Sequence, residues 1–219
     1  MITTIIVDFD DTLCLTEEAA YYLENEVFSR IGALQMEREV HRQTWGQPLL
    51  TAIHERSPGV DAEAFQKTFA LVMNDWVASQ RIDVISQANL AALDALLVAG
   101  KQIFLLTSRN IEEMRHLLAP DHVLTSRVKA MYYKEIMSHH KPDPRAFDNL
   151  LQEHNLTPDQ CVYVGDSPSD AAAAKGKGMH FIASLEAGVR TMHDFSAYPV
   201  DNFIEHFADL PVLIDKLSS

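Results

Sequence analysis

The chain has 219 residues, of which 47% are apolar and 22% charged, and its formal net charge is −13. This length allows one large domain or two modest ones, and the composition is typical of a globular protein. The acidic balance argues against nucleic acid or an anionic membrane as the main partner. Cys14 and Cys161 are too few for a disulfide framework or a zinc cluster. Without a signal-peptide pattern or an apolar run of about 18 residues, the sequence predicts a cytoplasmic protein.

The first predicted element is a buried strand over Ile5-Ile6-Val7, which ends in the acidic segment Asp8-Phe9-Asp10-Asp11. Side chains alternate along a strand, so Asp8 and Asp10 can point the same way while Phe9 turns into the core. Two converging carboxylates repel each other unless a cation or a shared proton lies between them. The pair therefore suits a hard divalent metal, or an ionised nucleophile beside a protonated acid. Taken alone, the segment fits a solvated Asp-rich turn equally well.

Helices alone are predicted from Glu17 to about Gln80. Two apolar stripes with helical spacing support this prediction, Ala20-Leu23-Val27-Ile31 and Phe65-Phe69-Val72-Trp76. The segments Gly46-Gln47-Pro48 and Ser57-Pro58-Gly59 are expected to break the helices.

The rest of the chain alternates between helix and strand. The predicted elements in order are a helix from Ser86 to Gly100, a strand over 102–106, a helix capped by Asn110 and Glu113, a strand over 128–132, a helix from Pro144, a strand over 160–164, a helix over 171–176 and a strand over 180–183. Repeated strand–helix units predict an α/β fold whose parallel sheet has helices on both faces. We expect the helical block to be an inserted cap over residues 15–81, with 1–14 and 82–219 forming the core domain.

Polar residues that suit phosphoryl transfer follow several predicted strands. They are Asp8, Asp10, Thr107, Ser108 and Asp166, with Lys141 in the intervening segment. Ligands of open α/β sheets bind at the carboxyl ends of the strands. There, one carboxylate can attack phosphorus, a second can protonate the departing oxygen, and a third can complete a magnesium site. A hydroxyl and a lysine can neutralise the phosphoryl oxygens. Each residue alone has a simpler structural explanation, but the set together favours this chemistry.

Four segments resemble the motifs of the haloacid dehalogenase-like (HAD) hydrolases. They are Asp8 to Leu13 (Asp-x-Asp-x-Thr), Leu105 to Ser108, Lys141 to Phe147 (Lys-Pro-x-Pro) and Val164 to Asp170 (Gly-Asp-Ser-x-x-Asp). All four occur in the family's order, and the resemblance covers the whole chain. The resemblance implies a Rossmann-like core with an inserted helical cap, as in the subgroup of phosphoglycolate phosphatase and β-phosphoglucomutase.

The resemblance also implies roles for the acidic residues. Asp8 would be the nucleophile and Asp10 the general acid/base. Magnesium would be held by the Asp8 side chain, the backbone carbonyl of Asp10 and Asp166.

Further roles carried over from the family concern the phosphoryl group and its support. Thr107 and Lys141 would bind the transferring phosphoryl group, with the backbone amides of Ser108 and Asp11 as helpers. Asp170 would orient Lys141 or a metal-bound water, and Thr12 would brace the loop that carries the general acid.

The chain departs from the family pattern after the first motif. Leu15 stands where many members have a helix-capping Asp, and we expect Thr16 to cap the helix instead. A cap segment with a comparable glycine turn reaches the substrate in the family, so Thr44, Gly46 and Gln47 are candidate specificity residues. An ordinary helix–helix turn explains them equally well.

The function that these expectations favour is a Mg²⁺-dependent phosphatase for a small phosphorylated metabolite, acting through a phospho-Asp8 intermediate. Two alternatives stay open: a phosphosugar mutase of the same subgroup, and a non-catalytic module that binds a phosphorylated ligand. A receiver-type signalling module is disfavoured, because such domains are shorter and have no helical insertion after the first strand. We expect no nucleic acid or membrane partner, and a monomer by default.

Overall fold

The computed structural model describes residues 1–47 and 49–218 of the chain. These residues fall into two units: Met1–Cys14 together with the described residues from Ile85 onward, and Leu15–Val84. The second unit ends three residues beyond the predicted cap boundary at 81. That the units act as a core and a cap domain remains a prediction. Among the described residues, no helix combines the length and the apolar character needed to cross a bilayer.

The first unit is built on a six-stranded sheet in which every pair of neighbouring strands is parallel. The strand order is β3-β2-β1-β4-β5-β6. The strands are β1 (Thr4–Val7), β2 (Gln102–Leu106), β3 (Ala130–Tyr132), β4 (Cys161–Gly165), β5 (His180–Ser184) and β6 (Asn202–Ile204). Val7 is in register with Leu105 on one side and with Val164 on the other. The segments that follow β1, β2 and β4 therefore leave the sheet at the same edge.

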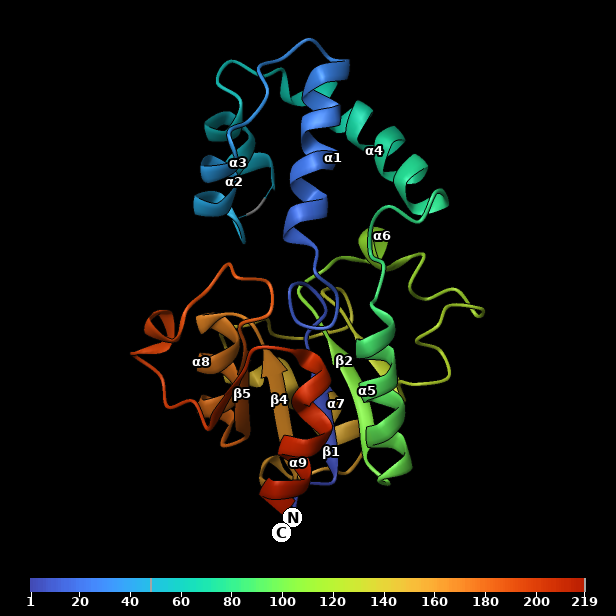
Figure 1. Ribbon diagram of the computed structural model, residues 1–219, viewed down its shortest axis with the longest axis vertical. Helices are drawn as coiled ribbons and strands as arrows, with labels where there is room; N and C mark the ends of the chain where they lie inside the picture. Colours follow the sequence, from blue (N-terminus) through green and yellow to red (C-terminus); the bar gives the residue numbers. More distant parts are fainter. Residues whose placement is uncertain (48, 219) are drawn as a thin grey trace. The chain divides into compact units, whose positions relative to one another are not determined.

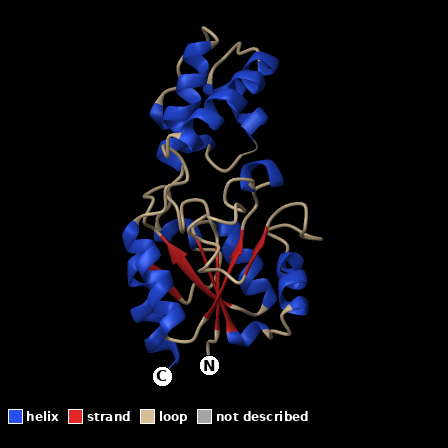
Figure 2. Cartoon of the chain, turned by 90° about the vertical axis from the view of Figure 1, so that its right-hand side faces the viewer, coloured by secondary structure: helices blue, strands red, loops and turns tan. Residues whose placement is uncertain are grey.

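Helices cover both faces of this sheet, as the sequence predicts (Figures 1 and 2). On one face α5 (Gln87–Val98) and α9 (Leu210–Ser218) share an apolar core with Ile5 and Val7 of β1. On the other face α7 (Asp148–Glu153) and α8 (Pro168–Lys177) pack with Ile6 and Tyr163. The strands are buried on both faces, and their residues are therefore mainly apolar, which is typical of a parallel sheet.

Short helical turns complete the first unit. They are α6 (Ile111–Met114), η1 (Pro144–Phe147), η2 (Pro158–Gln160), η3 (Met192–Phe195) and η4 (Phe207–Asp209). The capping box predicted from Asn110 and Glu113 is present at the start of α6. The helix predicted from Pro144 begins as the 3₁₀ turn η1 and continues as α7.

The second unit consists of helices only, as predicted. They are α1 (Glu17–Arg30), α2 (Arg38–Thr44), α3 (Leu49–Arg56) and α4 (Ala62–Ala78). The predicted stripes supply its core: Leu23 and Val27 of α1 pack with Phe65, Val72 and Trp76 of α4. The predicted break at Gly46-Gln47-Pro48 separates α2 from α3, although Pro48 itself lies outside the described residues.

The expected cap at the start of α1 is wrong in one respect. Thr16 occupies the N-cap position, but its side chain makes no capping hydrogen bond. Its backbone has helical angles, φ −105° and ψ −26°, instead of the extended conformation that directs an N-cap hydroxyl toward the first turn. By contrast, the Asp61 side chain accepts hydrogen bonds from the first-turn amides of α4.

A buried polar network joins α1, α2 and α3 inside the second unit. Arg56 donates through Nη1 to both carboxylate oxygens of Glu24 at 2.8 Å and through Nε to the Thr44 hydroxyl at 2.8 Å. The His41 ring contacts Glu17 at 2.7 Å. Since the side chains of Arg56 and Glu24 are at most 4% exposed, each charge depends on the other for compensation.

Candidate active site

Three strand ends bring the predicted catalytic segments together at one edge of the sheet. Asp8 follows β1 directly, Thr107 follows β2 and Asp166 follows β4. The Asp8 amide donates to the carbonyl of Val164 at 2.9 Å, so the β1–β4 pairing continues into the first acidic residue. Thr107 is buried, whereas the neighbouring Ser108 is exposed. Asp8, Thr107, Ser108 and Asp166 all belong to the first unit.

A tight turn after β1 separates the two carboxylates of the first motif. The amides of Leu13 and Cys14 donate to the carbonyl of Phe9 at 3.1 and 3.0 Å. Asp11 has φ +52°, a left-handed conformation that Asp tolerates better than most residues. The Asp8 side chain is 9% exposed and the Asp10 side chain 34% exposed. The inner carboxylate is thus shielded, and the outer one can meet solvent.

Lys141 lies at the centre of the site, and each of its three N–H groups has an acceptor within reach. Its Nζ is 2.7 Å from Oδ1 of Asp170, 3.2 Å from Oδ2 of Asp8 and 2.9 Å from the hydroxyl oxygen of Tyr163. Burial lowers the pKa of Lys141, but the carboxylates of Asp170 and Asp8 outweigh that effect and hold the pKa above the ordinary lysine value. Lys141 is therefore a permanent cation beside the candidate nucleophile.

Asp170 is held in place by its own helix and by a glycine. Its Oδ2 accepts from the amide and the hydroxyl of Ser167 at 3.0 and 2.7 Å, a capping box that starts α8. A Cβ on Gly165 would lie 2.6 Å from the Asp170 carboxyl group, closer than real contacts allow. Glycine at 165 is therefore needed for the carboxylate to approach β4 and reach Lys141.

Tyr163 of β4 connects three of the motifs. Its hydroxyl accepts from Lys141 at 2.9 Å, donates to the carbonyl of Leu106 at 3.1 Å and lies 3.2 Å from Oδ1 of Asp170. The sequence analysis did not select Tyr163, because an aromatic residue in a buried strand is normally interpreted as part of the hydrophobic core. The strand register pairs Tyr163 with Ile6 of β1, and the hydrogen bond to the Leu106 carbonyl shows that its hydroxyl reaches the end of β2.

Asp8, Asp166 and Asp170 form a cluster in which one carboxylate oxygen of each lies within 4.8 Å of the others. Burial, followed by the neighbouring carboxylates, raises the pKa of Asp8 to about 7 and that of Asp166 well above its usual range, although Lys141 opposes both shifts. One ammonium does not balance this much negative charge. Carboxylate oxygens are the ligands that Mg²⁺ prefers, so these residues fit a divalent cation. The further ligand expected from the Asp10 carbonyl remains a prediction.

Asp10 is engaged by Arg109, a second residue that the sequence analysis did not select. Nε of Arg109 lies 2.9 Å from Oδ2 and 3.2 Å from Oδ1 of Asp10, and Nη2 lies 2.6 Å from Oδ1. The guanidinium stacks over the Phe9 ring at 4.5 Å, and the Arg109 amide donates to the Thr107 hydroxyl at 3.2 Å. The sequence did contain a signal for this residue, because Arg109 is a cation that directly follows Thr107-Ser108 at a strand end.

The remaining predicted residues occupy less informative positions. Thr12 is fully buried, and within the described part of the chain its hydroxyl has no hydrogen-bond partner. In the second unit the Thr44 hydroxyl accepts from Arg56 and donates to the Val40 carbonyl at 2.7 Å. Gly46 has φ +86°, and both it and Gln47 are exposed. The roles of these residues stay predictions.

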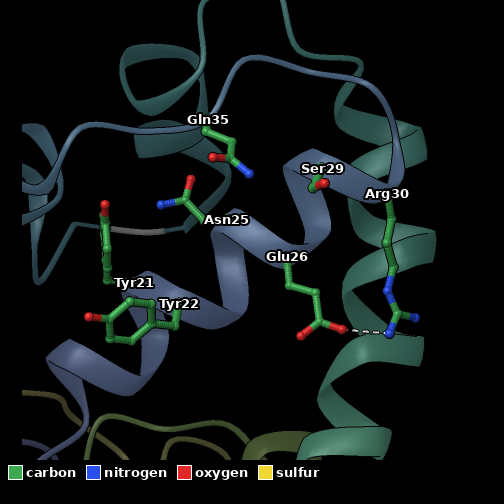
Figure 3. Close-up of a pocket in the computed structure, with 7 residues that line it drawn as sticks. All are labelled: Tyr21, Tyr22, Asn25, Glu26, Ser29, Arg30 and Gln35. Carbon is green, nitrogen blue, oxygen red and sulfur yellow. Dashed lines mark hydrogen bonds and ion pairs between the residues drawn. The ribbon is translucent and has the colours of Figure 1, made fainter.

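A separate cavity of about 400 Å³ lies in the second unit, beside α1 (Figure 3). Glu26 and Arg30 on its wall form an ion pair at 2.5 Å. The side-chain amide of Asn25 bonds to both the amide and the carbonyl of Met36, at 2.7 and 3.2 Å. Because these polar groups serve the fold of the unit, we assign no ligand to this cavity.

A parallel sheet with a helical insertion after β1, and acids, a hydroxyl and a lysine at its carboxyl edge, is an arrangement suited to phosphoryl-group hydrolases. Residues 5–184 match the family described as haloacid dehalogenase-like hydrolase, and the chain belongs to this family. This confirms the resemblance drawn from the four motifs.

Among curated relatives, a phosphoglycolate phosphatase of Aliivibrio fischeri is 33% identical over 91 residues, which cover 42% of this chain and 40% of that protein. The protein CbbY of Cereibacter sphaeroides is 25% identical over 228 residues, covering 96% and 94%. The chain thus spans well under two thirds of the first of these relatives.

Solved structures share the fold at low sequence identity. A predicted phosphoglycolate phosphatase from Haemophilus somnus has a TM-score of 0.78 at 18% identity, with 100% of this chain and 98% of that one covered. A putative β-phosphoglucomutase from Thermotoga maritima has a TM-score of 0.79 at 18% identity, covering 99% and 100%. CbbY from Rhodobacter sphaeroides with xylulose-(1,5)bisphosphate has a TM-score of 0.74 at 22% identity, covering 96% of each chain. These likenesses establish the α/β fold with its helical insertion.

Proposed function

We propose that this protein is a Mg²⁺-dependent phosphatase that hydrolyses a small phosphomonoester through a phospho-Asp8 intermediate. The observation that carries the proposal is the shielded Asp8 carboxylate, 3.2 Å from the Lys141 ammonium and inside a cluster of acids at the sheet edge. The similarity to phosphoglycolate phosphatases supports the same reaction class.

In the first half-reaction, a carboxylate oxygen of Asp8 attacks phosphorus and the bond to the leaving-group oxygen breaks. Asp10 donates its proton to that oxygen, so that an alcohol departs. The partial exposure of the Asp10 side chain suits this role, because the leaving group must approach it from solvent.

In the second half-reaction, water attacks the phosphorus of the acyl phosphate on Asp8. Asp10, now ionised, takes a proton from this water, and the Asp8 carboxylate is released together with inorganic phosphate. The two half-reactions return both carboxyl groups to their starting protonation states, so the cycle is balanced.

The phosphoryl group is bound by Lys141 and by the hydroxyl of Thr107, with Ser108 assisting at the exposed side. Lys141 would exchange one of its three present acceptors for a phosphoryl oxygen. Mg²⁺, held by Asp8, Asp166 and the carbonyl of Asp10, would supply charge neutralisation at the transferring phosphoryl group. Asp170 keeps Lys141 oriented throughout.

The proposed substrate is a small molecule, and the helical unit over residues 15–81 is proposed to act as the cap. Thr44, Gly46 and Gln47 are its candidate specificity residues. The compounds named for the relatives, phosphoglycolate and xylulose-(1,5)bisphosphate, each combine a phosphate ester with a second anionic group.

The experiment is phosphate release from a panel of small phosphomonoesters, with magnesium and with EDTA. We expect magnesium-dependent release from one substrate class. Interconversion of sugar phosphates without phosphate release would replace the phosphatase by a mutase. Neither activity in folded protein that binds magnesium would replace it by a ligand-binding module.

A further inference from the structure

The side chain of Arg109 contacts both oxygens of the Asp10 carboxylate, yet the proposed mechanism gives it no task. We propose that Arg109 is a positioning residue: it holds the ionised Asp10 carboxylate in the orientation that takes the proton from the attacking water, and so speeds the hydrolysis of phospho-Asp8. The inference rests on the proposed function. It deepens that function by assigning Arg109 to the second half-reaction and not to the first.

The geometry of the contact favours one form of the Asp10 side chain. Nε of Arg109 lies 2.9 Å from Oδ2 and 3.2 Å from Oδ1, and Nη2 lies 2.6 Å from Oδ1. A guanidinium in this place donates to both oxygens, which suits a carboxylate and not a carboxylic acid, whose hydroxyl would itself be a donor. The ionised form is the one that acts as a base on water. The contact therefore serves the second half-reaction.

Asp10 needs such a partner because packing alone does not fix its side chain. It lies in the turn after β1 and is 34% exposed, compared with 9% for Asp8. Exposed side chains change rotamer within picoseconds to nanoseconds. A general base must lie within hydrogen-bond reach of the proton that it removes. A fixed cation that contacts both carboxylate oxygens keeps the base in one place.

Arg109 is itself held firmly enough to fix another side chain. Its own side chain is 10% exposed, and its guanidinium stacks over the Phe9 ring at 4.5 Å. Its amide donates to the Thr107 hydroxyl at 3.2 Å, and its carbonyl accepts from the amide of Lys134 at 2.9 Å. The guanidinium is thus anchored to the segments that follow β1 and β2, and Asp10 belongs to the first of these.

The test follows both half-reactions in a single turnover of p-nitrophenyl phosphate, with acid quench and mass spectrometry of phospho-Asp8. Nitrophenolate leaves without a proton, so the formation of phospho-Asp8 from this substrate does not need an acid. In Arg109→Gln we expect formation at the wild-type rate and decay slowed by roughly ten- to a hundredfold, the loss that follows when a reacting group is misplaced by about 1 Å. In the steady state, kcat and KM should fall together once decay limits turnover, because kcat/KM contains only the first half-reaction.

Three further variants serve as controls. Arg127 contacts Asp94 through Nε and Nη2 at 2.8 and 2.9 Å, outside the site, so Arg127→Gln should leave both rates unchanged. Arg109→Lys keeps the charge and should recover part of the decay rate. In the Asp10→Asn background, Arg109→Gln should have no further effect on decay, because the carboxylate that it positions is gone.

Three results overturn the inference. They are decay of phospho-Asp8 at the wild-type rate in folded Arg109→Gln, an equal slowing of formation and decay, which would indicate a structural role alone, and a further loss of the decay rate when Arg109→Gln is added to Asp10→Asn. If Arg109→Gln does not fold, Arg109→Lys decides, since it should slow decay and spare formation. Failure of both the wild type and Arg127→Gln to form phospho-Asp8 or to release phosphate overturns the phosphatase itself.

Discussion

Tyr163→Phe removes one hydroxyl from the centre of the site and leaves the ring in the core. Lys141 loses its acceptor at 2.9 Å, and the Leu106 carbonyl loses a donor at 3.1 Å. A hydrogen bond to a charged group contributes roughly 1.5–3 kcal/mol, so we expect the free energy of unfolding to fall by about this amount. The Lys141 ammonium is then held by two carboxylates alone, and we expect kcat/KM to fall about tenfold, the equivalent of about 1.4 kcal/mol.

Tyr132→Phe is the matched control for this substitution. Tyr132 is also a buried tyrosine of the sheet, and its hydroxyl donates to a charged acceptor, Glu153, at 2.5 Å. Urea unfolding should show similar losses of stability for both variants, whereas steady-state kinetics should show a loss of activity for Tyr163→Phe alone. Equal kcat/KM values for the two variants would refute the positioning of Lys141 by Tyr163.

Three further predictions concern pH, the helical unit and the general acid. In EDTA the free energy of unfolding should fall as pH rises from about 4 to about 7, because folded Asp8 and Asp166 keep protons that the unfolded carboxyls have lost. The fall should be no more than about 1.4 kcal/mol per pH unit for each proton. In urea denaturation with added magnesium, this decline should disappear. Arg56→Met should lower the free energy of unfolding in urea by about 3–5 kcal/mol, because it leaves the buried Glu24 carboxylate without its cation. The double variant with Glu24→Leu should recover most of this loss of stability. Asp10→Asn should lower kcat for an alkyl phosphate by roughly 10²–10⁴-fold and for p-nitrophenyl phosphate by less, since nitrophenolate leaves without a proton; equal losses on both would contradict the acid role.

The sheet and its edge could be predicted because the relevant signals are local. Apolar runs that end in Asp8, Thr107 and Asp166 mark strand ends, and alternating helices require a parallel sheet. The elements near the carboxyl end were missed for a physical reason. β6 has three residues, of which only Ile204 is buried, and such a short edge strand is defined by its pairing with β5 and not by its own pattern.

The contacts between motifs could not be read from the sequence. The contact between the Tyr163 hydroxyl and Lys141 depends on how the strands are aligned in the sheet. The pairing of Arg109 with Asp10 joins residues 99 positions apart. Likewise, the hydrogen bond from Arg56 to the Thr44 hydroxyl joins residues of two different helices, and Thr44 stays a candidate specificity residue. Side-chain partners over such separations depend on the folded arrangement and carry no signature in residue spacing.

The most direct test of the account is mass spectrometry of enzyme quenched in acid during turnover, together with the kinetics of Asp8→Asn. The account predicts one phosphoryl group on the peptide that contains Asp8, and no turnover by folded Asp8→Asn protein. Phosphate release by Asp8→Asn at the wild-type rate would contradict the phospho-Asp8 intermediate, as would a phosphoryl group found on another residue.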